Sequence, residues 1–150
     1  MKEFKRILFP VDLSESSPKI VSYVQAVAEK FESKIHLLFA ARVFEYFASI
    51  YVPLPSIGQF EKEVIEGAER RLYEFMDQYF SEFVNTKAVV VAGDASEEII
   101  NYIEDKHIDL VIMGTHGRKG MDKILFGSVA ERVVKASPVP VMVVNPYKTD

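Results

Sequence analysis

The sequence predicts an α/β fold with a five-stranded, mostly parallel sheet and helices on both faces, and three observations lead to it. Short, almost continuous apolar runs, typical of strands buried on both faces, alternate with segments whose apolar residues recur at helical spacing. This alternation gives five strands and four helices in turn, which favours parallel strands joined by right-handed crossovers. The chain has 150 residues, 49% of them hydrophobic, enough to build the core of one domain. We therefore expect a doubly wound, Rossmann-like sheet in a single domain over residues 1–150.

Local signals place the elements along the chain. Ser17 followed by Pro18 is typical of a helix N-terminus, with serine as the N-cap and proline at the first helical position. Either Asp94 or Ser96 is expected to cap the third helix. Pro10 donates no ladder hydrogen bond, so we expect it at the carboxyl end of the first strand, where a neighbouring strand diverges. The expected strands are 6–13, 34–43, 86–93, 109–114 and 139–145, and the expected helices are 16–31, 59–84, 95–107 and 127–137.

Composition and charge argue against several classes of function. The net charge of -4 disfavours a partner such as nucleic acid or acidic lipid, which a basic face normally meets, so any anion site must be local. The absence of cysteine excludes disulfides, thiolate nucleophiles and cysteine metal sites, and it suits a reducing compartment. The first apolar run is short and already contains Asp12, so no signal peptide is expected, and no uncharged stretch reaches membrane-spanning length. A soluble cytoplasmic protein is the expectation.

The most informative stretch is GTHGRKGMDKILFGSV, residues 114–129, which contains four of the seven glycines. Gly114 and Gly117 follow a predicted buried strand, and glycine lets backbone amides turn toward a phosphate. Gly127 and Ser128 open a helix, whose first N–H groups are unpaired and whose dipole favours an anion. The window also contains the basic residues Arg118, Lys119 and Lys123. It therefore predicts a phosphate cradle, although glycines that only end a strand and begin a helix are the simpler alternative.

Other motifs fit the sequence less well. A P-loop would need a glycine at Lys119, and the dinucleotide fingerprint would need one at His116. The three histidines are scattered over a strand, a helix end and the glycine window, so a zinc site is not expected. Asp94 after the third strand suggests a phosphoacceptor, but Asp12 lacks the acidic neighbour that a receiver domain would place beside it.

The spacing G-x2-G-x9-G-S resembles the nucleotide-binding motif of the universal stress protein family, and it is complete at Gly114, Gly117, Gly127 and Ser128. The resemblance covers essentially the whole chain, including ILFPVDLSESSPKIVSYVQAVA, LVIMGTHGRKG and FGSVAERVVKASPVPVMVV. It implies a member of the subgroup that binds ATP, with Mg²⁺ as the accompanying ion. The acid that this family places after the first strand, at the adenosine end, corresponds to Asp12.

The resemblance also implies roles for individual residues. Asp12 would contact the ribose or the adenine edge, and Ala40 would contact adenine through its backbone, with the register between Ala40 and Ala41 left open. Met113 and Gly114 would flank the sugar. The complete set of expected binding residues is Pro10, Val11, Asp12, Ala40, Met113, Gly114, Gly117, Arg118, Gly127, Ser128 and Val129.

The last predicted strand suggests a partner. Its sequence, PVPVMVV, is apolar and expected at a sheet edge, where unpaired backbone groups invite pairing with another chain. The resemblance implies a homodimer formed through Val139 to Val144, whereas packing under a terminal tail is the alternative.

The resemblance implies a dimeric, ATP-binding stress-response protein that acts as a nucleotide-dependent regulator. A slow ATP phosphohydrolase or phosphotransferase is an alternative, but hydrolysis needs placed metal ligands and a group that orients water, and Asp122 is the one candidate in the window. An interaction module that binds no nucleotide is the third possibility. The role of the aromatic segment 44–57 is left open.

Overall fold

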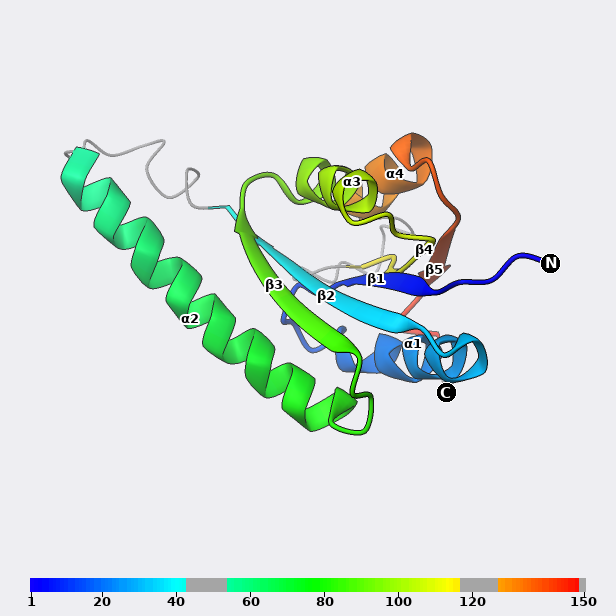
Figure 1. Cartoon of the computed structure of the whole chain (residues 1–150). Helices are drawn as coiled ribbons and strands as arrows, with labels where there is room; N and C mark the ends of the chain where they lie inside the picture. Colours follow the sequence, from blue (N-terminus) through cyan, green and yellow to red (C-terminus); the bar gives the residue numbers. More distant parts are fainter. Residues whose placement is uncertain (43–53, 117–126, 149–150) are drawn as a thin grey trace.

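The centre of the protein is a five-stranded sheet. The computed structural model describes residues 1–42, 54–116 and 127–148, and its strands lie in the order β3-β2-β1-β4-β5 (Figure 1). Every pairing between these strands is parallel, which confirms the predicted doubly wound α/β fold and makes the sheet wholly parallel. The strands are β1 Arg6–Pro10, β2 Lys34–Ala41, β3 Thr86–Ala92, β4 Leu110–Gly114 and β5 Val141–Val144.

Two helices cover each face of the sheet. Helices α1 and α2 lie on one face, and α3 and α4 lie on the other (Figure 1). Their bounds are α1 Pro18–Phe31, α2 Leu54–Phe80, α3 Ala95–Asp105 and α4 Ser128–Ala136. Within the described ranges, no helix combines the length and the apolar character needed to cross a membrane.

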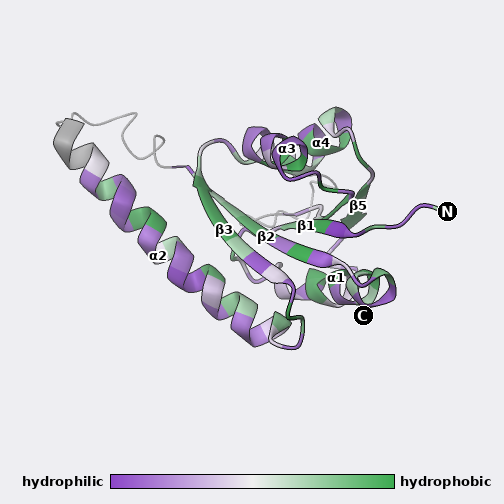
Figure 2. Cartoon of the chain, viewed as in Figure 1, coloured by the Kyte–Doolittle hydropathy of each residue, from purple (hydrophilic) through white to green (hydrophobic). Residues whose placement is uncertain are grey.

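The near-continuous apolar runs of the sequence follow from this layering. In β1, Ile7 and Phe9 pack with α1 and α2, whereas Leu8 between them packs with α3 and α4. Each of these side chains is at most 1% exposed, because strand residues alternate between faces and both faces are covered. A helix with only one buried side has both apolar and polar residues, and Figure 2 shows them alternating along the coloured part of α2.

Helix α2 differs from its predicted range at both ends. It begins at Leu54, earlier than the predicted residue 59. It ends at Phe80 rather than residue 84, because the amide of Phe83 bonds to the carbonyl of Phe80 and turns the chain toward β3. Phe80 is buried at 2% exposure and Val84 is 91% exposed, so the last predicted turn has little apolar surface to bury.

Of the two predicted helix caps, one forms the expected hydrogen bond and the other does not. Asp94 caps α3 as expected, since its carboxylate accepts from the amide of Glu97 at 3.1 Å. Ser17 precedes α1 but makes no side-chain cap bond, so that prediction is wrong in its chemistry. The Ser17 hydroxyl donates instead to the carboxylate of Asp12 at 2.8 Å, and a hydrogen bond to a charged acceptor is stronger than one to a neutral group.

The strand order reverses between β1 and β4, and Pro10 lies at that point. Strand β1 pairs with β2 along its whole length, but with β4 only at Ile7 and Leu8. Because the Val11 amide bonds to Leu38 on β2, a donor at position 10 would point to the opposite side, where β4 has already diverged. The proline therefore costs no ladder bond, as predicted. This divergence opens a crevice at the carboxyl ends of the strands, where such sheets bind ligands.

Candidate functional site

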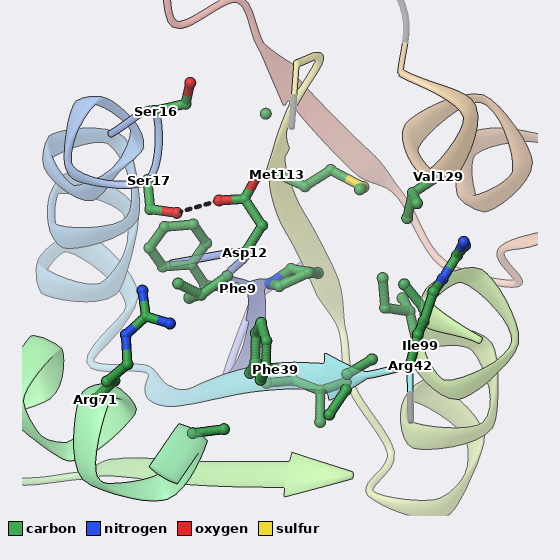
Figure 3. A pocket seen from close by; sticks show the side chains of 18 of the residues that line it. Phe9, Asp12, Ser16, Ser17, Phe39, Arg42, Arg71, Ile99, Met113 and Val129 are labelled. Carbon is green, nitrogen blue, oxygen red and sulfur yellow. Dashed lines mark hydrogen bonds between the residues drawn. The ribbon is translucent and has the colours of Figure 1, made fainter. Parts of the chain in front are cut away.

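A cavity of about 1350 Å³ lies at the carboxyl ends of β1, β2 and β4 (Figure 3). This volume exceeds the roughly 300–1000 Å³ of most small-molecule sites, so a nucleotide fits within it. The predicted binding residues that line it are Pro10, Val11, Asp12, Ala40, Met113, Gly114, Gly127, Ser128 and Val129. Gly117 and Arg118 lie outside the described residues. Ala41 also lines the cavity, so both positions of the register left open by the sequence border it.

The carboxylate of Asp12 is held in one orientation. Its Oδ1 accepts from the Ser14 amide at 3.0 Å, from the Ser14 hydroxyl at 2.7 Å and from the Ser17 hydroxyl at 2.8 Å; Figure 3 draws the last of these bonds. Leu13 makes the bend possible with a left-handed backbone, φ 60°. Among the described residues Oδ2 has no hydrogen-bond partner, so Asp12 offers a fixed acceptor to a hydroxyl or amino group of a ligand.

Another part of the lining is formed by the residues that follow β4 and by the start of α4, and Thr115 links these two segments through backbone hydrogen bonds. The Thr115 amide bonds to the Val144 carbonyl at 2.9 Å, and the Thr115 carbonyl accepts from the Gly127 amide. Gly127 is the N-cap of α4 and, having no side chain, leaves the first amides of that helix uncapped. Uncapped amides and the helix dipole together favour an anion such as a phosphate.

Gly114, the last residue of β4, has two close neighbours. A Cβ atom built there would lie 3.4 Å from the carbonyl oxygen of His116 and 3.5 Å from Cδ1 of Ile20. Both distances are ordinary van der Waals contacts, so a Cβ atom at position 114 would fit between these neighbours. The space around Gly114 therefore does not by itself require glycine at this position.

Arginines are among the lining residues, and the sequence motifs did not predict Arg42 and Arg71 there. Arg71 of α2 donates to the carbonyl of Leu13 at 3.2 Å and so ties the helix to the segment that holds Asp12. Arg42 at the end of β2 forms an ion pair with Asp94 at 3.0 Å. Helical spacing predicts that Arg71 borders the buried side of α2, but only the crossing of α2 over the sheet brings it near residue 13.

Asp94 is occupied as a cap and an ion-pair partner. Its pKa is lowered, first by the hydrogen bond from the Ser96 hydroxyl and then by the bond from the Glu97 amide, with Arg42 and Arg132 contributing further. A carboxylate that accepts hydrogen bonds from Ser96, Glu97 and Arg42 fits a structural role better than the phosphoacceptor role that the sequence left open.

Several lining residues were absent from the predicted set, among them Ser16, Ser17, Phe39, Thr115 and His116. Ser16 and Ser17 follow Asp12 closely in the sequence, so their short polar side chains could have been predicted to lie near the ligand that Asp12 was expected to contact. His116 is 9% exposed and its Nδ1 is 2.9 Å from the Thr115 hydroxyl. His116 follows Thr115, the first residue after β4.

The histidines show no sign of a metal site. His36 is buried on β2, with Nδ1 2.7 Å from the hydroxyl of Tyr102, on the side of the sheet covered by α3. Burial, and after it the charge of Lys34, lowers its pKa to about 4. No group of three or more histidine, aspartate or glutamate side chains that could hold a metal occurs in residues 1–42, 54–116 and 127–148.

Comparison with known proteins identifies the family. The family model described as "Universal stress protein family" matches residues 3–145. The chain belongs to the universal stress protein family. A relative of this chain, universal stress protein MJ0531 of Methanocaldococcus jannaschii, is 30% identical over 153 aligned positions that cover 98% of this chain and 85% of the relative.

A solved member of the family has a closely similar structure. Universal stress protein MJ0577 of Methanocaldococcus jannaschii is 29% identical in sequence, and the alignment covers 95% of both chains. The solved structure of MJ0577 matches this universal stress protein with a TM-score of 0.78 at 30% identity, over 96% of this chain and 97% of that one. A universal stress protein of Archaeoglobus fulgidus, solved in complex with dAMP, has the same fold at 14% identity, with a TM-score of 0.68 and coverage of 96% and 100%.

Proposed function

We propose that this universal stress protein binds an adenine nucleotide, with ATP as the working ligand, and acts in the stress response as a dimeric, nucleotide-dependent regulator. The observation that carries the proposal is one cavity with a fixed carboxylate, Asp12, on one side and the uncapped amides of α4 on another. A nucleotide needs both features, because its sugar and base donate hydrogen bonds while its phosphates are anionic. An ordinary apolar pocket would need neither.

Relatives support the choice of an adenine nucleotide. The Archaeoglobus fulgidus protein was solved with dAMP, an Arabidopsis thaliana universal stress protein with AMP, and another universal stress protein with cAMP. These three ligands share adenine and differ in the sugar and the phosphate. The shared adenine favours adenine recognition in this chain. The relatives' ligands are all monophosphates, so ATP as the ligand is our own further proposal.

In this proposal each side of the cavity has one task. Asp12 accepts hydrogen bonds from the ribose or the adenine edge, and the backbone at Ala40 contacts adenine. Met113 and Gly114 flank the sugar, and Pro10 and Val11 border the same end. The phosphates lie at the start of α4, against Gly127, Ser128 and Val129, with Gly117 and Arg118 proposed as further contacts.

The proposed Mg²⁺ would arrive with ATP. Magnesium keeps most of its waters and is commonly held by substrate phosphates and one or two carboxylates. A preformed cluster of three protein ligands is therefore not required for this role. We also propose that residues 1–150 act as one domain in the cytoplasm and that the homodimer forms through Val139 to Val144.

The first test is to denature the purified protein and identify any released nucleotide by mass spectrometry. Calorimetric titration with ATP and Mg²⁺ then measures affinity. We expect a dissociation constant near the micromolar level, which corresponds to a binding free energy of about -8 kcal/mol.

The variant Gly127→Val should weaken binding strongly, because the added side chain would occupy the space where the α4 amides meet the phosphate. Gly58→Val is the control, since a Cβ at Gly58 meets nothing within 4 Å.

Two results would redirect the proposal. A protein that purifies without nucleotide and gives no heat with ATP, AMP or cAMP would favour the interaction module. Phosphate release above background that disappears in Ser128→Ala would favour the slow phosphohydrolase instead.

A further inference from the structure

The chain that follows β5 folds back beside the end of β4. Strand β5 ends with the Val144 carbonyl bonded to the Thr115 amide at 2.9 Å. Asn145 then begins a turn in which its side-chain oxygen accepts from the amide of Tyr147 at 3.0 Å. The turn places the Tyr147 ring next to His116, the residue that follows Thr115. A residue close to the C-terminus thus lies beside the lining of the cavity.

The Tyr147 ring has two specific neighbours. It meets the imidazole of His116 edge to face, with ring centroids 4.9 Å apart and planes at 84°. The ammonium of Lys19, in the first turn of α1, lies 5.2 Å from the centroid of the same ring. Both distances are within the range of favourable aromatic and cation–π contacts. Tyr147 therefore connects α1 to the segment that leaves β4.

One neighbour of Tyr147, His116, lines the proposed phosphate end of the cavity, and the other, the exposed Lys19, lies next to His116 but outside the lining. His116 lines the cavity together with Thr115 and Gly127. Lys19 follows Ser16 and Ser17, which line it from the side of α1. The lining arginines are elsewhere: Arg42 follows β2, and Arg70 and Arg71 belong to α2. Lys19 is thus a positive charge that an aromatic ring holds next to His116, and within residues 1–42, 54–116 and 127–148 no carboxylate forms an ion pair with it.

We propose that Tyr147 is a positioning residue of the nucleotide site, whose ring keeps the Lys19 ammonium and the His116 imidazole at the phosphate end. Lys19 then attracts the phosphates of the bound nucleotide. The attraction grows with the number of phosphate charges, so it is large for ATP, smaller for AMP and absent for adenosine. This inference rests on the proposed function and adds to it a role for the C-terminal segment.

Calorimetric titration of the full chain with ATP, AMP and adenosine tests the proposal. Tyr147→Ala should weaken ATP binding about three- to tenfold, the scale of a lost cation–π contact and a displaced charge, and leave adenosine affinity unchanged. Tyr147→Phe keeps the ring and should bind ATP like the wild type. The matched control is Tyr23→Ala, because Tyr23 is also on the α1 side and is 39% exposed, against 38% for Tyr147.

A second variant, Lys19→Gln, tests the proposal without removing the Tyr147 ring. Lys19→Gln leaves the ring in place and should also lower the preference for ATP over adenosine. If both residues act together, the double variant should lose no more than the larger single loss. Thermal unfolding of each variant checks that the fold survives.

Three outcomes have distinct meanings. Selective loss of ATP affinity in Tyr147→Ala and Lys19→Gln supports the inference. Equal loss for ATP and adenosine, or no loss at all while the wild type binds ATP, overturns it and leaves the proposed function standing. A wild type that binds none of the three ligands overturns the proposed function, and the inference with it.

Discussion

At the scale of single residues, the candidate site depends on how Asp12 is held. A carboxylate on a freely rotating side chain loses conformational entropy when it binds a ligand. Asp12 has lost that freedom already, because one of its oxygens accepts three hydrogen bonds from Ser14 and Ser17. Among the described residues the other oxygen has no partner, so it is available to the proposed ligand. Ser17, which the sequence suggested as a helix cap, therefore acts on the site through Asp12.

Ser17→Ala should reduce ATP affinity by about three- to tenfold, since one hydrogen bond to a charged group contributes roughly 1 kcal/mol or somewhat more. Titration calorimetry measures the change. Ser96→Ala is the matched control, because Ser96 is 5% exposed against 4% for Ser17 and also donates to a carboxylate, that of Asp94, at 2.6 Å. It should alter stability but not binding. Equal affinities for Ser17→Ala and the wild type would mean that Ser14 alone orients Asp12.

At the scale of elements, the packing of α3 on the sheet includes one polar contact. His36 on β2 bonds to Tyr102 on α3, and its Nε2 atom is buried without a partner in the described structure. Burial lowers the pKa of His36 to about 4 and raises that of Tyr102 to about 12, so both side chains are neutral at pH 7. The nearby charges of Lys34, Lys87, Arg6 and Lys106 further oppose protonation of the histidine.

This contact predicts a pH dependence of stability. The His36 pKa is about 4 in the folded state and about 6.5 when unfolded, so the unfolded chain binds the proton more readily. His36 therefore stabilises the fold above pH 6.5, and that contribution falls as the pH drops from 6.5 to 4, by up to about 3 kcal/mol. Denaturant unfolding at several pH values measures the slope.

Replacing both partners isolates the effect. The double variant His36→Leu with Tyr102→Phe removes the titrating group without leaving a buried polar atom unpaired, so its pH slope should be shallower than that of the wild type. His107→Asn serves as the control, because His107 is exposed and asparagine tolerates its left-handed backbone, φ 53°. Parallel slopes for the double variant and the wild type would contradict the prediction.

The elements themselves were largely predictable from the sequence, and the cavity only in part. Apolar runs and helical spacing located every strand and helix of the described residues, because a sheet covered on both faces needs strands that are apolar throughout and helices that are apolar on one side. The ends of α2 were not predictable, since they depend on a turn at Phe83 and on where the sheet ends. Likewise, spacing found Gly114 and Gly127, but the approach of Arg71 to Leu13 depends on how α2 crosses the sheet.

At the scale of the whole molecule, β5 is an edge strand whose outer side bears apolar residues. Among the described strands it pairs with β4 alone. Met142 on this strand is 38% exposed, and Val134 on the adjacent helix α4 is 45% exposed. An exposed strand edge beside exposed apolar side chains is a surface that a second copy of the chain can cover. The proposed phosphate end is nearby, because Val144 of the same strand bonds to Thr115.

The proposed homodimer can be tested at this edge. Sedimentation velocity at micromolar concentrations should give a dimer for the wild type, and Met142→Lys should shift it to monomer, because a buried lysine charge at the interface is costly to desolvate. Val84→Lys is the control, since Val84 is 91% exposed after α2, near the opposite edge of the sheet. A monomeric wild type would contradict the dimer. A Met142→Lys variant that stays dimeric would instead place the interface elsewhere.

The same variant tests whether the strand edge also supports the nucleotide site. If it does so through Val144 and Thr115, the monomeric variant should bind ATP more weakly than the Val84→Lys control.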